Sequence, residues 1–215
     1  MSTPTELCAE IHRLCTSLPI FKEPSEVPFD NGLYLFYEEG EVSAHGPKGR
    51  IVRVGNHRRS QNRLKDRLRD HYSGNKNASV FRRLVGGAIM RKVNPDDPCL
   101  APAPGEGHWE KHHAPTCEKC KPIEREVTKR IKDKFYFRCI EIDDKSLRNT
   151  LEKKLVATIS PCSVCRPSES WIGKFAYSEK VRRSGLWNSD CVFDRTLILS
   201  AIELRELEEA ICSEV

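Results

Sequence analysis

Residues 31–41, NGLYLFYEEGE, and residues 49–55, GRIVRVG, decide how this chain folds. In the first stretch Tyr34 alternates with Leu33 and Leu35, which is the period-2 pattern of a β-strand. The second stretch is rich in β-branched residues and follows the first after an acidic turn. The two stretches predict adjacent strands, and adjacent strands alone are compatible with many folds.

The rest of the chain predicts one further strand and several helices. The aromatic and Ile-rich stretch KFYFRCIEI at 134–142 predicts a third strand. Residues 94–122 are rich in Pro, Gly, His and Cys, which indicates a loop or a metal-held insertion. Apolar periodicity predicts helices at about 5–18, 60–72, 78–90, 123–133, 143–160 and 197–215. We therefore expect an α+β fold in which helices flank the strands.

We expect two regions along the chain. Residues 1–30 form an N-terminal helix and an extended, Pro-containing lead. Residues 31–215 form the main domain, with the Cys/His-rich insertion at about 94–122 and a C-terminal helical extension. The last helix either caps the fold or meets a partner.

Composition limits the class of protein. The 215 residues are 38% hydrophobic and 31% charged, which suits one sizeable core. No stretch approaches the roughly twenty apolar residues that span a bilayer, and the first residues lack a signal-peptide pattern. We expect a soluble cytoplasmic protein with no membrane partner, whose ten cysteines stay reduced. Clusters among these cysteines then indicate metal before disulfides.

Positive charge is concentrated in one part of the chain. Residues 48–92 hold fourteen Lys and Arg against two acidic residues, a net charge of +12 in a chain of net charge +5. Neighbouring Gly, Asn, Ser and His add uncharged donors, a combination that suits a phosphate backbone. A solvated basic face is the alternative. The predicted nucleic-acid contacts are Arg58, Arg59, Arg63, Lys76, Arg82, Arg83, Arg182 and Arg183.

The helix predicted at 143–160 carries a carboxylate within its apolar face. At 100° per residue, Glu152 falls between Ile159 and Val156 in a continuous apolar arc. A buried carboxylate costs several kcal/mol unless it is paired, hydrogen-bonded, protonated or bound to a cation. Glu152 is therefore either an edge residue bonded to a buried arginine or a metal ligand at the floor of a cleft.

Other polar residues share defined faces of their elements. Arg67 and His71 lie four residues apart on one predicted helix, which places them on one face. Tyr34 points away from the face that holds Leu33 and Leu35. Taken alone, an arginine and a histidine at this spacing are more often surface residues than site residues.

In their order and approximate spacing, these residues resemble the GIY-YIG nuclease superfamily. The similarity covers roughly residues 31–160. Two further stretches, ASVFRRLVG and SGLWN, are similar to a bacterial and archaeal branch of restriction or defence type. The resemblance rests on GLY at 32–34, RVG at 53–55, the helix with Arg67 and His71, and the later helix with Glu152.

The resemblance implies a fold and a role for each residue. Family members have a small three-stranded antiparallel sheet flanked by helices and are divalent-metal-dependent phosphodiesterases that act on nucleic acid. Tyr34 would act as general base or position the attacking water. Glu152 would hold Mg²⁺ (or Mn²⁺) at the scissile phosphate and the leaving 3′ oxygen. Arg67 would brace a non-bridging oxygen, and His71 would bond the phosphate or the nucleophile network.

Two positions depart from the family pattern. Arg53 stands where the family has its second tyrosine, and an arginine cannot act as a base. Arg53 or the nearby His57 must therefore replace that phenol or do something else. The asparagine that usually follows the family glutamate by about a dozen residues is also missing. Asn188 in SGLWN would have to fold back to take its place, or the role is lost.

Two Cys-X-X-Cys pairs have the spacing of zinc ligands. Cys117 and Cys120 form one pair, and Cys162 and Cys165 form the other, so together they predict a tetrahedral four-cysteine site. In a second grouping, Cys117 and Cys120 bind zinc together with ligands from the same insertion. The alternative is a set of reduced thiols that pack as small hydrophobic groups. The insertion residues considered for the second grouping are Cys99, His108, His112 and His113.

Two functions follow from these patterns. The first is a divalent-metal-dependent endonuclease, with DNA favoured over RNA as its substrate. The second is a non-catalytic, zinc-stabilised nucleic-acid-binding protein with the same fold, in which Arg53 reflects lost activity. A palindromic target would favour a homodimer.

Overall fold

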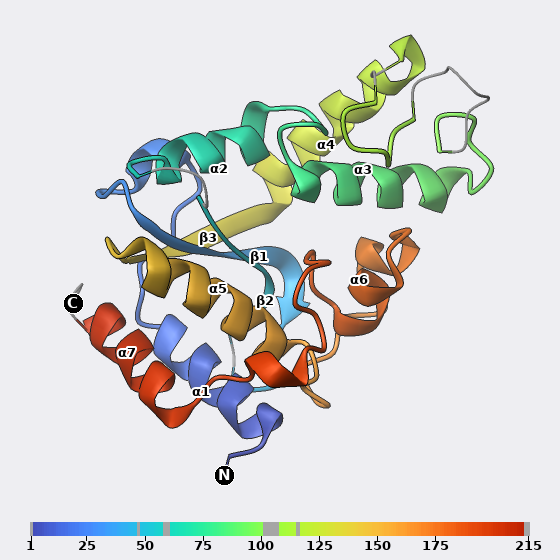
Figure 1. Ribbon diagram of the computed structural model, residues 1–215. Helices are drawn as coiled ribbons and strands as arrows, with labels where there is room; N and C mark the ends of the chain where they lie inside the picture. The colour runs from blue at the N-terminus through green and yellow to red at the C-terminus, as the bar shows by residue number, and fades with distance from the viewer. Residues whose placement is uncertain (1, 47, 58–60, 101–107, 115–116, 213–215) are drawn as a thin grey trace.

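The computed structural model describes residues 2–46, 48–57, 61–100, 108–114 and 117–212. A three-stranded antiparallel sheet lies at its centre, in the order β2–β1–β3. Figure 1 shows helices on both sides of this sheet. The predicted α+β class with a small antiparallel sheet is confirmed. The strands are β1 (Gly32–Val42), β2 (Gly49–Asn56) and β3 (Phe135–Glu141).

Alternation in the central strand β1 separates two hydrophobic cores. Tyr34 belongs to the core on one face of the sheet, and Leu33 and Leu35 belong to the core on the other. Both faces are covered by helices, so the first seven residues of β1 are all buried. The pairing of β1 with β2 sets Tyr34 opposite Gly55. The predicted placement of Tyr34 on the face opposite Leu33 and Leu35 is thus confirmed.

Three helices cover the face of the sheet that holds Tyr34 (Figure 1). The serine before the second of them, Ser79, is its N-cap and accepts a hydrogen bond from the Arg82 backbone N–H. The third helix follows the Cys/His-rich insertion and leads directly into β3. These helices are α2 (Leu64–Ser73), α3 (Val80–Val93) and α4 (Lys121–Lys134).

Three other helices cover the opposite face, namely α1 (Pro4–Cys15), α5 (Lys145–Ile159) and α7 (Ala201–Cys212). Helix α1 begins with a capping box at Thr3 and packs against α5 and α7. Ile11 of α1 is fully buried in this second core. The N-terminal helix is therefore built into the fold, while a domain boundary at residue 30 stays a prediction.

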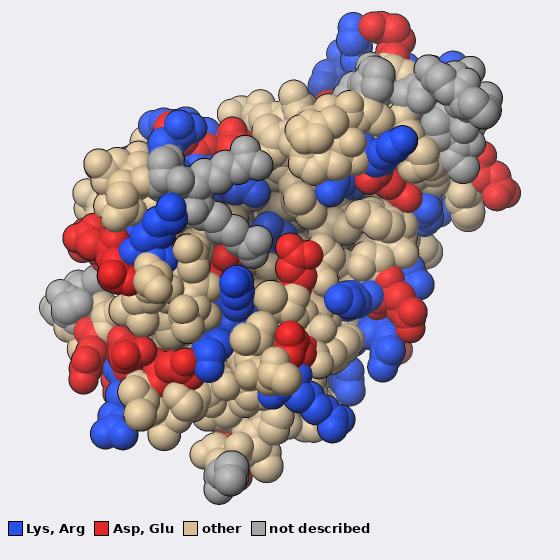
Figure 2. Space-filling model, viewed as in Figure 1, with Lys and Arg blue, Asp and Glu red and all other residues tan. Residues whose placement is uncertain are grey.

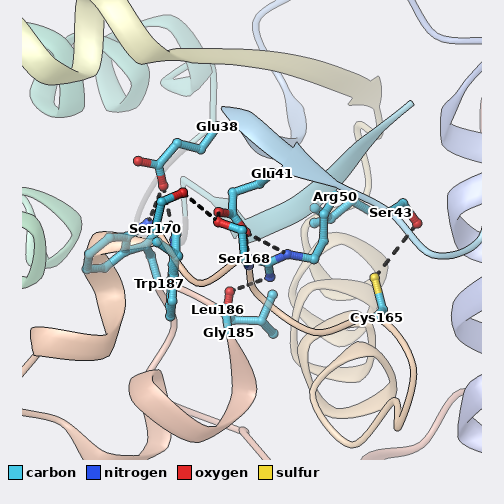
Figure 3. Close-up of polar contacts among 12 residues, drawn as sticks. Glu38, Glu41, Ser43, Arg50, Cys165, Ser168, Ser170, Gly185, Leu186 and Trp187 are labelled. Atoms are coloured by element: carbon cyan, nitrogen blue, oxygen red, sulfur yellow. Dashed lines mark hydrogen bonds and ion pairs between the residues drawn. The ribbon is translucent and has the colours of Figure 1, made fainter. Parts of the chain in front are cut away.

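After α5, the chain returns to the outer edge of β2. The backbone N–H of Trp187 donates a hydrogen bond to the Val52 carbonyl of that strand. Arg50 of β2 forms a buried ion pair with Glu41 of β1 at 2.6 Å, and it also donates to the Gly185 carbonyl at 2.6 Å (Figure 3). The two hydrogen bonds fasten the returning segment to β2. The ion pair joins β1 to β2 and holds the Arg50 guanidinium in place, because breaking a buried ion pair is costly.

The remaining elements are short. Helix α6 (Glu179–Ser184) ends at Gly185, which has the left-handed conformation that favours glycine. No helix in the described ranges is long and apolar enough to cross a bilayer. The 3₁₀ turns are Pro24–Glu26, Glu118–Cys120, Ile172–Phe175 and Arg195–Leu197.

Candidate active site

A polar pocket lies beside the edge strand β2, with a cavity volume of about 620 Å³. Strand β2, helices α2 and α5, and the segment around residue 188 all contribute to its lining. The pocket brings together five of the six predicted catalytic residues. These are Tyr34, Arg53, His57, Arg67 and Glu152.

Tyr34 reaches the pocket because two neighbouring positions are glycine. A Cβ at Gly55, the residue opposite Tyr34, would lie 2.2 Å from the Tyr34 phenol oxygen. A Cβ at Gly32 would lie 2.2 Å from the Ile140 carbonyl oxygen of β3. The glycine of RVG therefore makes room for the Tyr34 ring, and the glycine of GLY makes room for the adjacent strand.

We expect Gly55→Ala to displace the Tyr34 ring. The added methyl group overlaps the phenol, and overpacking of this kind destabilises a protein by about 1–3 kcal/mol. The urea midpoint should fall, and any activity that depends on the Tyr34 phenol should fall with it. If Gly55→Ala were as stable as wild type, the Tyr34 ring would have space to move and the expected overlap would be contradicted.

His71 lies behind Tyr34 and holds its phenol. His71 Nε2 is 2.7 Å from the Tyr34 hydroxyl oxygen, and His71 Nδ1 is 2.7 Å from Ser79 Oγ. The ring is fully buried, and this burial, together with Arg67 and Arg53 nearby, holds the His71 pKa well below its usual value. Both ring nitrogens have partners, so a neutral His71 orients Tyr34 from the interior, and the expected direct bond to a phosphate is not supported.

The buried His71 predicts lower stability in mild acid. Its pKa is depressed in the folded protein, so below about pH 6.5 the unfolded chain binds a proton that the folded protein does not. Stability due to His71 is thus fully present above pH 6.5 and is lost as pH falls toward the folded-state pKa. Between pH 6.5 and 5.5 the loss is about 1 kcal/mol.

The measurement is the free energy of unfolding in urea across this pH range, for wild type and His71→Gln. Between pH 6.5 and 5.5 the free energy of unfolding should fall by about 1 kcal/mol more in wild type than in His71→Gln, because glutamine does not titrate. Parallel curves for the two proteins would contradict a neutral, buried His71.

Arg53 lies beside Tyr34 and is held by the returning segment. Its guanidinium lies 5.3 Å from the centre of the Phe81 ring and donates a short hydrogen bond to the Trp187 carbonyl. Burial lowers the Arg53 pKa, an effect opposed by the neighbouring Tyr34. Arg53 therefore brings a buried positive charge to the phenol in the place where the family pattern has a second phenol.

Glu152 lies almost fully buried on α5 and lines the pocket. Asn56 also lines the pocket, and its Nδ2 donates to Asn149 Oδ1 at 3.0 Å. The buried Asn56 Oδ1 has no hydrogen-bond partner among the described residues. A carboxylate together with a buried amide oxygen is a donor set that suits a hard cation such as Mg²⁺, which takes few protein oxygens and completes its shell with water and phosphate. The residues present thus fit the metal that the resemblance implies.

Asn188 reaches the pocket by folding back along β2. Its Oδ1 accepts from the Val54 N–H at 3.1 Å, and its Nδ2 donates to the Val54 carbonyl at 2.9 Å. The side-chain amide thereby pairs with the edge strand as a further strand would. His57 is held in a similar way, since its Nε2 accepts from the Gly32 N–H at 3.2 Å. Both residues line the pocket, and both are positioned by backbone bonds.

The predicted basic contacts divide into several groups. Arg63 lines the pocket, and Arg182 and Arg183 are exposed on α6. Arg58 and Arg59 lie outside the described residues. On the face shown in Figure 2, Lys and Arg are interspersed with Asp and Glu. Arg63, together with Arg53 and Arg67, is positioned to meet a phosphate that enters the pocket.

Three of the expected contacts are buried instead. Lys76 is fully buried and donates to the Lys111 and Ala114 carbonyls at 3.2 and 2.9 Å. Arg82 is fully buried and donates to the Glu124 carboxylate at 2.9 Å, and Arg83 is largely buried. Their burial corrects the prediction: Lys76 joins the segment before α3 to the insertion, and Arg82 joins α3 to α4. A charge total along the chain could not reveal that.

The two Cys-X-X-Cys pairs lie in separate places, which corrects the predicted four-cysteine site. Cys117 Sγ is 2.9 Å from Cys120 Sγ and 3.2 Å from Cys99 Sγ, in the core on the Tyr34 face. Cys162 and Cys165 lie in the core on the other face of the sheet. Of the four residues considered for the second predicted grouping, Cys99 is the one that lies with Cys117 and Cys120 in a metal-ligand group of the described residues.

The insertion histidines have other positions. His112 and His113 line the polar pocket, with their ring centres 3.7 Å apart. His108 Nδ1 accepts a hydrogen bond from the Glu110 N–H at 3.1 Å. Among the described residues, the metal-ligand group of the insertion contains the three cysteines alone.

Comparison with known families decides what this arrangement represents. A sequence model described as the GIY-YIG domain matches residues 15–213. The chain belongs to the GIY-YIG family. Searches of curated proteins and of solved structures found no match. The GIY-YIG match includes α5 with its surroundings and the returning segment with Asn188, so it extends well beyond the stretch from 31 to 160 that carries the resemblance.

Membership of the GIY-YIG family supports a nuclease-type fold and a nucleic-acid substrate for this chain. Sequence reasoning on this GIY-YIG chain missed Asn56 and Ser79. Neither has a distinctive spacing, because each takes its place through a hydrogen bond that only the folded chain creates.

Proposed function

We propose that this GIY-YIG protein is a divalent-metal-dependent endonuclease that hydrolyses phosphodiester bonds of DNA. The observation that carries the proposal is the meeting of Tyr34 and Glu152 in one pocket. Tyr34 comes from the core on one face of the sheet, while Glu152 comes from a helix that covers the other. A phenol, a carboxylate and three arginines around one cavity suit a reaction that activates water and neutralises a phosphate.

Tyr34 would receive the proton of the attacking water or align that water. His71 fixes the position of the phenol through its 2.7 Å contact, and Ser79 in turn fixes His71. Arg53 places a positive charge beside the phenol. Fixed donors and charges of this kind lower the barrier because they need no rearrangement during the reaction.

Glu152 and Asn56 would hold Mg²⁺ or Mn²⁺. When bound, the cation supplies positive charge for the phosphate and for the leaving 3′ oxygen. Arg67 lines the same pocket and would brace a non-bridging phosphate oxygen. Its guanidinium is oriented by a 2.7 Å hydrogen bond to the Ala78 carbonyl.

The insertion would bind a structural zinc ion through Cys99, Cys117 and Cys120. Their sulfur atoms lie within 4.8 Å of one another, and thiolates are preferred zinc ligands. A bound ion would link the insertion to the start of α4, where Cys120 precedes the helix. This part of the chain also carries His112 and His113, which line the pocket.

A non-catalytic nucleic-acid-binding protein is the second candidate. It is favoured by Arg53, which stands in place of the second family tyrosine and cannot transfer a proton. Such a protein would retain the pocket and its cations and would bind nucleic acid without cleaving it.

Incubation of supercoiled plasmid with the purified protein separates the two candidates. We expect nicked or linear plasmid in Mg²⁺ or Mn²⁺ and intact plasmid after EDTA treatment, because removing the cation removes its charge from the site. Single-stranded and double-stranded RNA incubated in parallel test the preference for DNA. Intact plasmid under every metal condition would favour the binding protein.

A further inference from the structure

A second cluster of cysteine and histidine side chains lies apart from the pocket, in the core on the opposite face of the sheet. It forms where α1, the loop between β1 and β2, and the segment after α5 meet. The ligand atoms of Cys8, His45 and Cys162 lie within 4.8 Å of one another, as do those of Cys8, His12 and Cys165. Segments more than 150 residues apart along the chain therefore converge on Cys8.

The hydrogen bonds distinguish the two histidines. His12 Nδ1 lies 2.8 Å from the Cys8 carbonyl, and its Nε2 accepts from the Ile51 N–H at 3.3 Å. One neutral tautomer satisfies both contacts, so both His12 nitrogens are used by the backbone. His45 Nε2 instead faces Cys162 Sγ at 3.2 Å. His45 is therefore the histidine whose ring nitrogen is directed at the sulfur atoms.

We propose that Cys8, His45, Cys162 and Cys165 form a zinc site with three sulfur ligands and one nitrogen ligand. This set matches the Cys₃His type of structural zinc site, and Cys162 and Cys165 have the usual two-residue spacing. The three cysteines are all buried, and no disulfide joins them. Soft thiolates with one imidazole select zinc over the hard cations that suit the pocket.

The surroundings of the sulfur atoms agree with this site. Ser43 Oγ lies 3.7 Å from Cys165 Sγ (Figure 3), so a hydroxyl group can donate to that sulfur. Polar groups that bond to the ligands commonly orient them around a metal. A set of thiols that merely filled apolar space would have no need of them.

The site would join three elements of the fold. Cys8 lies on α1, His45 in the hairpin loop, and Cys162 and Cys165 directly after the end of α5. Helix α5 carries Glu152 in its middle. Zinc would thus fix the end of α5 against the hairpin that carries Tyr34, and its binding free energy would add to the stability of the fold. This site does not depend on the nuclease proposal.

Zinc content measured on purified protein tests the site by difference. Cys8→Ala and His45→Ala should each contain about one zinc ion fewer per chain than wild type. Cys15→Ala is the matched control, because Cys15 is also fully buried on α1 and belongs to no ligand group in the described residues. Equal zinc in wild type and the Cys8→Ala and His45→Ala variants would overturn the site, whatever the insertion cysteines bind.

A measurement on wild type alone guards against variants that do not fold. The protein is alkylated with and without a zinc chelator, and the modified cysteines are mapped by mass spectrometry. We expect Cys8, Cys162 and Cys165 to become reactive only after chelation, while Cys15 stays protected. Cysteines whose reactivity the chelator leaves unchanged would mean that burial alone protects them and would overturn the proposal.

Discussion

Glu152→Gln should slow DNA cleavage by about 10³-fold, which corresponds to roughly 4 kcal/mol of transition-state stabilisation. Glutamine keeps the size of the side chain and one oxygen, but it removes the negative charge that attracts the cation. The loss should be only partly restored by raising Mg²⁺. Single-turnover cleavage of plasmid at several Mg²⁺ concentrations measures the effect.

The stability of the Glu152→Gln variant distinguishes a site residue from a structural one. If Glu152 served only to neutralise a buried arginine, removing its charge would destabilise the fold by about 3–5 kcal/mol. We expect a smaller change in the free energy of unfolding, because Arg53, the buried arginine whose pKa the Glu152 charge raises, is also held by the Trp187 carbonyl and the Phe81 ring. Unchanged cleavage, or slow cleavage that simply follows partial unfolding, would contradict the role of Glu152 in the reaction.

Tyr34→Phe should have the second largest effect, a loss of about 10²–10³-fold in cleavage rate. The ring would still fill its place in the core, while the hydroxyl that contacts His71 at 2.7 Å would be gone. DNA binding should change little, because the phenol is buried and the arginines that line the pocket are unchanged.

Tyr37→Phe is the matched control for Tyr34→Phe. Tyr37 lies on the same strand, is also buried, and belongs to the core on the opposite face of the sheet. Cleavage by this variant should stay within about twofold of wild type, since a residue remote from the chemistry has little effect on the barrier. Equal losses in both variants would assign the effect of Tyr34 to packing.

Much of the fold could be predicted because it depends on local patterns. Alternation in residues 31–41 placed Tyr34 on one face, and helical periodicity placed Glu152 within a buried arc. Both assignments follow from the geometry of a single element. The family match then supports the α+β arrangement around those elements.

The features that sequence reasoning missed depend on contacts between distant segments. Lys76 and Arg82 stand among other cations along the chain, yet each is buried by carbonyl or carboxylate partners from the insertion and α4. Cys8 has apolar neighbours at helical spacing, which is the pattern of a core residue. Only the folded chain places its sulfur atom near that of Cys162. Charge and motif spacing along the chain contain no information about such partners.

The arrangement of the two Cys-X-X-Cys pairs also depends on contacts between distant segments. Two Cys-X-X-Cys pairs predict metal ligands, but spacing does not determine which pairs share an ion. The sheet lies between Cys117 and Cys162, and the two cysteines belong to different cores. Only the fold distinguishes one shared site from two separate ones.

The fate of bound DNA on addition of Mg²⁺ tests the central claim most directly. The protein is first saturated with labelled duplex DNA in EDTA, excess Mg²⁺ is then added, and the bound DNA is recovered at successive times. We predict that wild type converts the bound DNA to shorter products while Glu152→Gln retains it intact. Wild-type protein that holds intact DNA throughout would contradict an active site built from Tyr34 and Glu152.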